Sequence, residues 1–212
     1  MNARRYKSPG RDAAASQTRE KILAAAAAML GTAKDIDDFS LEAVAKKAGV
    51  TRLTVYNQFG SRRALLEAVF DERAARGGLH RLGEATARSD PHAALLQVIA
   101  IFCDFWTFDP GALRLLHAAG ASDSELAVSV GERNERRRRL FAALVRRLAE
   151  TTPMPAKSQR DLVDTLFALT SFWFFSQLMT GGRTAAAACR MIQDLAENAV
   201  RRASADTSGS RR

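Results

Sequence analysis

The chain has 212 residues, of which 47% are hydrophobic, and its formal net charge is +9. This length provides a core for one large domain or two smaller ones. Its two cysteines, Cys103 and Cys189, are too few and too far apart for a disulfide framework or a Cys-x-x-Cys zinc site, so we expect buried thiols in a reducing cytoplasm. The basic N-terminus contains no apolar stretch, and we expect no secretory signal.

The positive charge is concentrated in the first third of the chain. Residues 1–63 contain 12 Lys and Arg against 6 Asp and Glu, whereas the remaining residues contain 20 against 17. This asymmetry favours a polyanion as the partner of the N-terminal third. Residues 1–15 contain nothing that would bury a core, and we expect a disordered basic arm. Such an arm either enters a DNA minor groove or is simply solvated, and the sequence leaves both readings open.

The first helix is expected from about Gln17 to Leu30, because apolar residues recur there at helical spacing. Thr18 stands at its expected start. A hydroxyl beside the free N–H groups of a helix N-terminus is a suitable site for a phosphate.

Residues 40–60 predict two short helices separated by a tight turn. Ser40 is a candidate N-cap for the first helix, and Gly49 ends it. Thr51 is a candidate N-cap for the second helix, which ends at Gly60. In a helix-turn-helix motif the second helix enters the DNA major groove. Helical hairpins without a nucleic-acid role have the same pattern, so the pattern alone does not decide between the two.

The second of these helices has two different sides. Val55 and Phe59 are expected in the core. The other side combines a guanidinium, an aliphatic group, a phenol and an amide, from Arg52, Leu53, Tyr56 and Asn57. These are the groups that contact phosphates, thymine methyls and base edges.

A longer pattern runs in register from Thr18 to Phe70. It comprises Phe39-Ser40, Val44-Ala45, Ala48-Gly49-Val50-Thr51, Thr54-Val55-Tyr56, Phe59-Gly60-Ser61 and Ala64-Leu65-Leu66. It resembles the N-terminal signature of TetR-family transcriptional regulators. The resemblance implies a homodimeric repressor whose variable C-terminal domain binds an effector. It departs from the family at Asn57, where His is common, and in residues 31–40, which lack the usual Gly-aromatic pair.

The resemblance also implies phosphate contacts from Thr18 and from Arg62, which matches a family Lys. Arg62 and Arg63 occupy the first turn of the next helix, where cations oppose the helix dipole unless an anion binds nearby. The full set of expected DNA-binding residues is Thr18, Ser40, Thr51, Arg52, Leu53, Thr54, Tyr56, Asn57 and Arg62.

The remaining residues predict further helices. After one that starts at Ser61, helices are expected at about 91–107, 110–119, 124–150, 158–180 and 183–202. The fold class is therefore all-α with about nine helices. Residues 16–63 form a three-helix helix-turn-helix domain and residues 64–202 a larger effector-binding and dimerisation domain, followed by a disordered tail at 203–212. The Arg136–Arg139 run is interpreted as a solvated outer face.

Residues 165–182 contain no charged residue over 18 positions, which is close to the minimum for a membrane span. Their Thr, Ser and Gln residues and the final Gly181-Gly182 pair favour instead a helix buried on several sides in a soluble protein. We expect no membrane association.

Aromatic and apolar residues of the larger domain suit a pocket for an apolar or aromatic ligand, although each of them is also typical of a core. The candidates are Phe102, Phe105, Trp106, Leu113, Leu116, His117, Trp173 and Phe174. Small residues of the last helix permit close helix approach, and the family pairs its last two helices across an isologous interface. The interface candidates are Leu166, Phe175, Ala188, Ile192, Leu195 and Ala199.

These features predict a cytoplasmic, nucleoid-associated transcriptional regulator. It would bind a palindromic operator in double-stranded DNA as a homodimer, with half-sites about 10 base pairs apart, and a small apolar or aromatic effector would release it. Repression is the family default. The alternative is an effector-independent or architectural DNA-binding protein of the same fold. His80, His92 and His117 have no metal-binding spacing and no catalytic motif is present, so neither a cofactor nor enzyme activity is expected.

Overall fold

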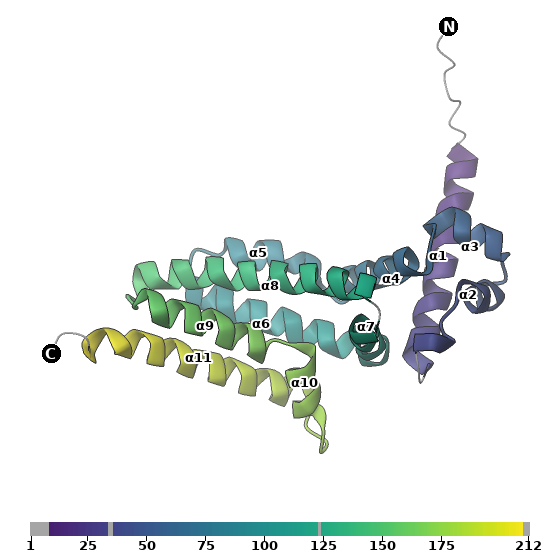
Figure 1. The fold of residues 1–212 in the computed structure, drawn as a ribbon. Coiled ribbons are helices and arrows are strands. Elements are labelled where there is room, and N and C mark those ends of the chain that lie inside the picture. The colour runs from purple at the N-terminus through teal and green to yellow at the C-terminus, as the bar shows by residue number, and fades with distance from the viewer. Residues whose placement is uncertain (1–8, 34–35, 123, 210–212) are drawn as a thin grey trace, which may run out of the picture. The chain divides into compact units, whose positions relative to one another are not determined.

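The structure, a computed structural model, describes residues 9–33, 36–122 and 124–209 (Figure 1). These residues contain helices, turns and loops and no strand, which confirms the all-α class. The α-helices are α1 (Pro9–Thr32), α2 (Leu41–Ala48), α3 (Arg52–Phe59), α4 (Arg62–Arg76), α5 (Leu82–Ala87), α6 (Pro91–Phe108), α7 (Pro110–Ser122), α8 (Ser124–Thr151), α9 (Ala156–Leu169), α10 (Phe172–Met179) and α11 (Ala185–Gly209). Two short 3-10 helices, η1 (Ile36–Asp38) and η2 (Leu79–Arg81), lie between them.

The described residues thus form eleven α-helices rather than about nine. One addition is α5, in the stretch expected to be a linker, where Ala85 is fully buried. The other arises because residues 158–180 form two helices that meet at an angle of 53°. The side chain of Ser171 accepts a hydrogen bond from the Phe174 N–H at 3.2 Å and so caps a new helix start. The single long helix expected there was wrong.

Two helix ends also differ from expectation. Helix α1 begins at Pro9, so residues 9–15, expected in the disordered arm, are helical. Proline suits the first turn of a helix, and Ala13–Ala15 are strong helix formers. Helix α11 continues to Gly209, so most of the expected C-terminal tail is helical as well. The rest of the arm, residues 1–8, and residues 210–212 lie outside the described residues.

The chain forms two compact units. The first comprises residues up to Glu72 together with Gly111–Leu126. Its core is made by the inner sides of α1 to α4 and by α7, with Ile22, Val44, Val55 and Leu66 fully buried. Helix α7 starts against the end of α1: a Cβ on Gly111 would lie 2.8 Å from the Gly31 carbonyl oxygen, so only glycine fits at position 111.

The second unit comprises Arg73–Pro110 and Ala127–Arg212. Helix α6 packs against α5, α10 and α11 and buries ten of its residues. Among the described residues, α6 is the one single helix that is long and apolar enough to cross a membrane, and α9 and α10 would qualify only as one bent pair. Its burial by neighbouring helices is typical of a core helix.

Candidate nucleic-acid interface

Helices α2 and α3 are joined by a turn whose ends are fixed by caps. Ser40 Oγ accepts a hydrogen bond from the Ala43 N–H at 3.1 Å, and Thr51 Oγ1 accepts one from the Thr54 N–H at 3.1 Å. Between the helices, Gly49 adopts a left-handed conformation with φ of 64°, which favours glycine. The predicted helix-turn-helix is therefore present, and its geometry is set by residues close together in the sequence.

Helix α3 exposes one side. Val55 is fully buried, whereas the side chains of Leu53 and Tyr56 are 66% and 56% exposed. They are the exposed large hydrophobic residues among the described residues of the first unit. Arg52 and Asn57 are also exposed on this helix. Exposed apolar groups beside a guanidinium and an amide are typical of a contact surface rather than a solvated face.

The opposite side of α3 is held by α1. The Arg19 guanidinium lies 4.2 Å from the ring centroid of Phe59, and its Nη1 donates a hydrogen bond to the Gln58 carbonyl at 2.9 Å. A cation at the C-terminal end of a helix complements the helix dipole. Sequence reasoning missed this role of Arg19, because its partners are 39 and 40 positions away and no local pattern connects them.

Two expected phosphate contacts have different surroundings from those assumed. Thr18 lies inside α1, where its hydroxyl donates to the Ala14 carbonyl at 2.8 Å, so it is not at a helix N-terminus. The Arg62 guanidinium donates to the carbonyls of Phe39 and Ile36, both at 2.8 Å, and thereby holds the segment before α2. Thr18 is therefore not at a free helix end, and the Arg62 guanidinium has backbone partners within the chain.

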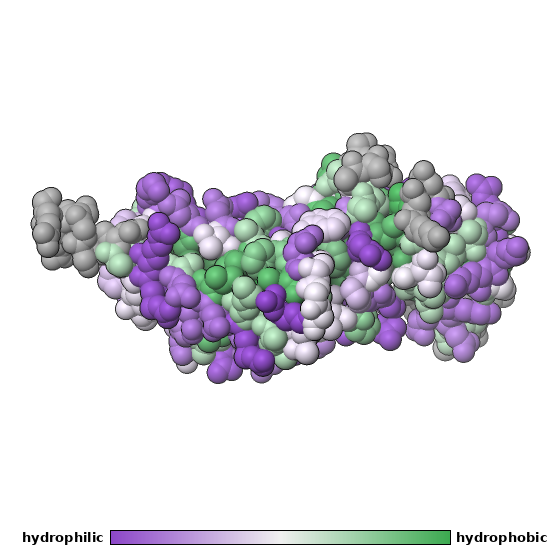
Figure 2. Space-filling model, turned by 90° about the horizontal axis from the view of Figure 1, so that it is seen from below, coloured by the Kyte–Doolittle hydropathy of each residue, from purple (hydrophilic) through white to green (hydrophobic). Residues whose placement is uncertain are grey.

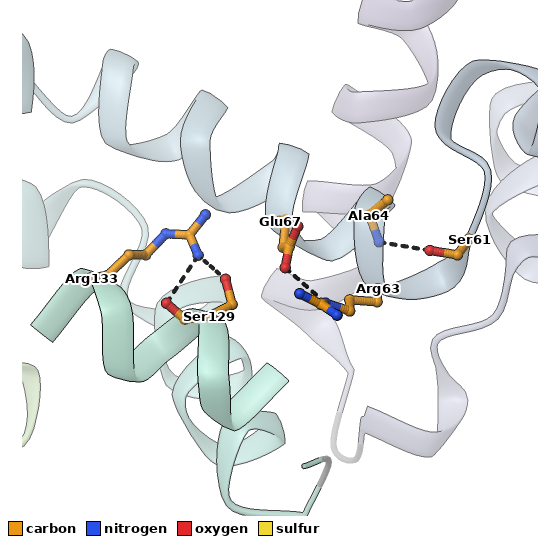
Figure 3. Close-up of polar contacts among 6 residues, drawn as sticks. All are labelled: Ser61, Arg63, Ala64, Glu67, Ser129 and Arg133. Carbon is orange, nitrogen blue, oxygen red and sulfur yellow. Dashed lines mark hydrogen bonds and ion pairs between the residues drawn. The ribbon is translucent and has the colours of Figure 1, made fainter. Parts of the chain in front are cut away.

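Figure 3 shows the start of α4, where Ser61 Oγ accepts from the Ala64 N–H at 3.1 Å and so caps the helix. In the same view Arg63 Nε lies 2.9 Å from a carboxylate oxygen of Glu67, one turn later. The charge of Arg63 at this helix start thus has a carboxylate partner within the same helix.

The aromatic effector candidates on α6 are packed core residues. Phe102, Phe105 and Trp106 are at most 5% exposed. The rings of Phe105 and Trp106 have centroids 4.6 Å apart, and Trp106 Nε1 donates to the Thr170 carbonyl at 3.0 Å. The structure brings these three residues together, but as a filled interior.

The other effector candidates lie elsewhere. Leu113, Leu116 and His117 are on α7 in the first unit, where the two leucines are buried and His117 Nδ1 lies 2.8 Å from the Leu113 carbonyl oxygen. Trp173 and Phe174 are on α10 in the second unit, half-exposed and half-buried respectively.

A hollow of about 780 Å³ lies in the second unit between α6, α11 and residues 76–81. Its wall includes Arg81, Ala100, Cys103, Asp104, Cys189 and Gln193. Arg81 Nη2 forms an ion pair with Asp104 Oδ2 at 2.6 Å. None of the eight effector candidates belongs to this wall. The small residues of α11, Ala185, Ala186 and Cys189, are the sequence signal that was available for it.

Most of the predicted interface residues are buried within one protomer. Leu166, Phe175, Ala188 and Ile192 are at most 3% exposed, because other helices of the same chain cover them. Leu195 is 36% exposed and Ala199 is partly exposed. Hydrophobic side chains gather over the half of α11 next to α10 (Figure 2), and the exposed large ones in this region are Trp173, Met191 and Leu195.

One arginine of the Arg136–Arg139 run is inside the second unit. Arg137 is 8% exposed, its Nη1 donates to the Thr170 carbonyl at 2.5 Å, and its guanidinium lies 4.2 Å from the centre of the Phe167 ring. Burial, with a smaller contribution from the charge of Arg138, lowers the pKa of Arg137 to about 10. The expected solvated face was therefore wrong at this position.

The described residues combine a capped helix-turn-helix with a larger helical body. Residues 22–69 match the model of the family described as bacterial regulatory proteins, tetR family. This segment is therefore similar to that family over 48 residues, and the described residues have the fold of solved TetR-family structures.

Solved structures agree with this fold. A TetR transcription regulator from Haloarcula marismortui has 14% sequence identity and a TM-score of 0.70, over 89% of this chain and 98% of that chain. A TetR-like transcriptional regulator from Rhodococcus sp. RHA1 has 18% identity and a TM-score of 0.68, over 85% and 94%. A structure described as a transcriptional regulator from Pseudomonas aeruginosa PAO1 has 17% identity and a TM-score of 0.72, over 89% and 94%. No curated protein matches the chain in sequence.

Among the described residues, no group of three or more His, Cys, Asp or Glu side chains is arranged to hold a metal ion.

Proposed function

We propose that the protein is a ligand-responsive transcriptional regulator that binds a palindromic DNA operator as a homodimer and acts as a repressor. The observation that carries this proposal is the exposed side of α3, with Leu53 and Tyr56 projecting beside Arg52 and Asn57. It acts by binding rather than by catalysis, and its place is the bacterial cytoplasm, at the nucleoid.

The four residues of this side have complementary roles on DNA. The Arg52 guanidinium suits guanine or phosphate oxygens, and the Asn57 amide suits adenine. Leu53 suits a thymine methyl, and the Tyr56 hydroxyl suits a phosphate. With about 6 phosphate contacts per dimer, the logarithm of the binding constant falls with the logarithm of salt concentration with a slope of about −5.

The other candidate residues have supporting roles. Ser40 and Thr51 cap the two helices and keep their first N–H groups in place, and Thr54 is bonded to Thr51. Arg62 holds the segment before α2 through two carbonyls. We assign these residues, together with Thr18, to positioning the reading helix, with backbone phosphate contacts from the exposed hydroxyl of Thr51.

The proposed dimer interface is the exposed hydrophobic part of α10 and α11. Trp173, Met191 and Leu195 supply the large side chains, and Ala199 allows close approach along α11. A single recognition helix reads only a few base pairs. Specific binding therefore needs two helix-turn-helix segments, one from each protomer, at a fixed separation. Half-sites are expected about 10 base pairs apart, one turn of the duplex.

The proposed effector site is the hollow between α6 and α11. Alanine side chains and Phe108 offer apolar contacts, while Arg81, Asp104 and Gln193 offer polar ones. This combination suits a small apolar or aromatic molecule with one polar end. A ligand that favours a different arrangement of α6 and α11 shifts the population away from the operator-binding form. The second candidate function is that of an effector-independent DNA-binding protein. It would use the exposed side of α3 and would need no effector site.

Selection of bound sequences from random duplex DNA tests the central proposal. The wild type is compared, at one salt concentration, with Arg52→Ala and Tyr56→Ala, both of which remove exposed side chains. Arg139→Ala, an exposed arginine on α8, is the matched control. We expect an enriched inverted repeat with the wild type and the control and its loss in both α3 variants. Binding without an enriched motif, unchanged in the α3 variants, would show that α3 is not the reading helix.

A further inference from the structure

The two cysteines of the chain line the same hollow. Cys103 is on α6 and Cys189 on α11, 86 positions apart in the sequence, and these helices pack against each other in the second unit. The two side chains lie close enough for each to shift the pKa of the other. Cys103 is 4% exposed, whereas Cys189 is partly exposed. Two distant cysteines thus form a pair of thiols with one accessible member, and no local pattern connects them.

The surroundings of the two thiols differ. The hydrogen bond to Cys189, together with burial, raises the pKa of Cys103. The hydrogen bond from Cys103 lowers the pKa of Cys189, and the charge of Arg190 adds to this, while burial and Asp104 oppose it. The thiolate is therefore favoured on the more accessible sulfur. A thiolate is the reactive form of cysteine, and accessibility decides which one an oxidant meets first.

We propose that Cys103 and Cys189 form an oxidation site for hydroperoxides, in which Cys189 reacts first and Cys103 then closes a disulfide between α6 and α11. This activity goes beyond the proposed binding of DNA and does not depend on it. The hollow of about 780 Å³ admits hydrogen peroxide and small organic hydroperoxides. Its alanine walls, at Ala100, Ala185 and Ala186, leave the approach to the sulfurs open.

The chemistry proceeds in two steps. The Cys189 thiolate attacks the terminal oxygen of the hydroperoxide, an S–O bond forms, the O–O bond breaks, and the alcohol leaves after taking up a proton. The Cys103 sulfur then attacks the sulfur of the resulting sulfenic acid, the S–S bond forms, and the S–O bond breaks. The hydroxyl leaves with the Cys103 proton as water. Two thiols lose two electrons in total, and the hydroperoxide gains them.

The geometry permits the second step with a small movement. Both sulfurs face the same hollow, and they must approach each other to the disulfide bond length of about 2.05 Å. The hollow beside them gives the side chains room to rotate. Once formed, the bond links the second half of α6 to the first half of α11, and it alters the wall of the proposed effector site.

Oxidation of the native full-length protein by hydrogen peroxide tests this inference. In the wild type we expect both titratable thiols to disappear, the intact mass to fall by two hydrogens, and the protein to remain uncrosslinked between chains on a non-reducing gel. Dithiothreitol should restore both thiols. In Cys103→Ala, Cys189 should still react, more slowly than in the wild type because the partner that lowers its pKa is gone, and accumulate as a sulfenic acid that dimedone traps. In Cys189→Ala, the oxidation rate of Cys103 should be at least about tenfold lower than that of the wild-type protein.

Other results would overturn the inference. These are two thiols that remain titratable at excess peroxide, a gain of oxygen without a disulfide, a disulfide between two chains, or equal reaction rates in the two single variants. Tyr56→Ala should oxidise as the wild type does, because it leaves the second unit unchanged. Operator binding and oxidation are therefore measured separately in Tyr56→Ala. A failure of the DNA-binding proposal would change the first result, and a failure of the oxidation proposal would change the second. Far-UV circular dichroism before oxidation establishes that each alanine variant is folded.

Discussion

Helices α3 and α6 are both rich in apolar and aromatic residues, but they use them in opposite ways. On α6 the rings of Phe102, Phe105 and Trp106 fill an interior, because the helix has neighbours on several sides. On α3, Tyr56 and Leu53 project into solvent beside polar groups, and Val55 alone is fully buried. The difference teaches that an aromatic residue marks a binding surface only where its helix has an uncovered side.

The largest effect expected from this comparison is on stability. Phe105→Ala removes a fully buried ring that packs on Trp106 and should lower the free energy of unfolding by about 3–5 kcal/mol. Tyr56→Ala removes an exposed ring and should change it by less than about 0.5 kcal/mol. Urea denaturation of both variants measures the contrast. Equal losses of stability would mean that α3 is as deeply packed as α6 and would remove the argument for an exposed reading side.

Arg62 tests whether a cation near the reading helix positions the protein or contacts DNA. Arg62→Met removes two hydrogen bonds to carbonyls of the Ile36–Phe39 segment and should cost about 1–3 kcal/mol of stability. The slope of operator affinity against salt should be unchanged, because no phosphate contact is lost. A slope that becomes shallower by about one for each subunit would instead assign Arg62 to a phosphate. Arg139→Met is the exposed control.

The burial of the Arg137 guanidinium can be tested through the pH dependence of the free energy of unfolding. Its pKa is lowered to about 10 in the folded protein, so from about pH 9 upward the folded state binds fewer protons than the unfolded state. The free energy of unfolding therefore rises with pH in this window. Relative to Arg137→Met, the wild type should gain about 1 kcal/mol between pH 9 and pH 11, measured by denaturant unfolding at each pH. A constant difference would mean that Arg137 is solvated.

The smallest expected effect concerns the caps that hold α3. Thr51→Ala leaves the Thr54 N–H without its side-chain acceptor and should lower stability by about 1 kcal/mol or less. Thr51→Ser keeps the hydroxyl and is the matched control. Operator affinity should fall with Thr51→Ala and recover in the serine variant. If the two variants behave alike, the hydroxyl is not what orients the helix.

The parts of the fold that the sequence predicted are those set by near neighbours. Ser40, Gly49 and Thr51 make their interactions within a few positions, so pattern and capping were sufficient to find α2 and α3. The break at Ser171 is also local, but a continuous apolar stretch concealed it. A hydroxyl residue inside such a stretch deserves to be considered as a possible new cap.

The parts that the sequence did not predict depend on distant residues. Arg62 and Arg137 bond to carbonyls 23 and 33 positions away, and neither partner has a side-chain signature. The hollow between α6 and α11 is likewise formed by segments distant in the chain. Hydrophobicity correctly selected Phe105 and Ile192 as residues that avoid water, but it does not distinguish a core from a pocket or an interface.

Because the turn at Gly49 between α2 and α3 is short, the number of residues in this helix-turn-helix matters as much for its geometry as their identity does. Each residue of an α-helix is rotated by about 100° from the one before it. An insertion of one residue early in α3 would therefore turn Tyr56 and Asn57 away from their present direction and bring polar groups to the position of Val55. If α3 reads DNA as proposed, substitutions on its outward side should change which DNA sequence is bound, whereas insertions and deletions should abolish sequence-specific binding. The segment can thus diversify in sequence while its length remains fixed.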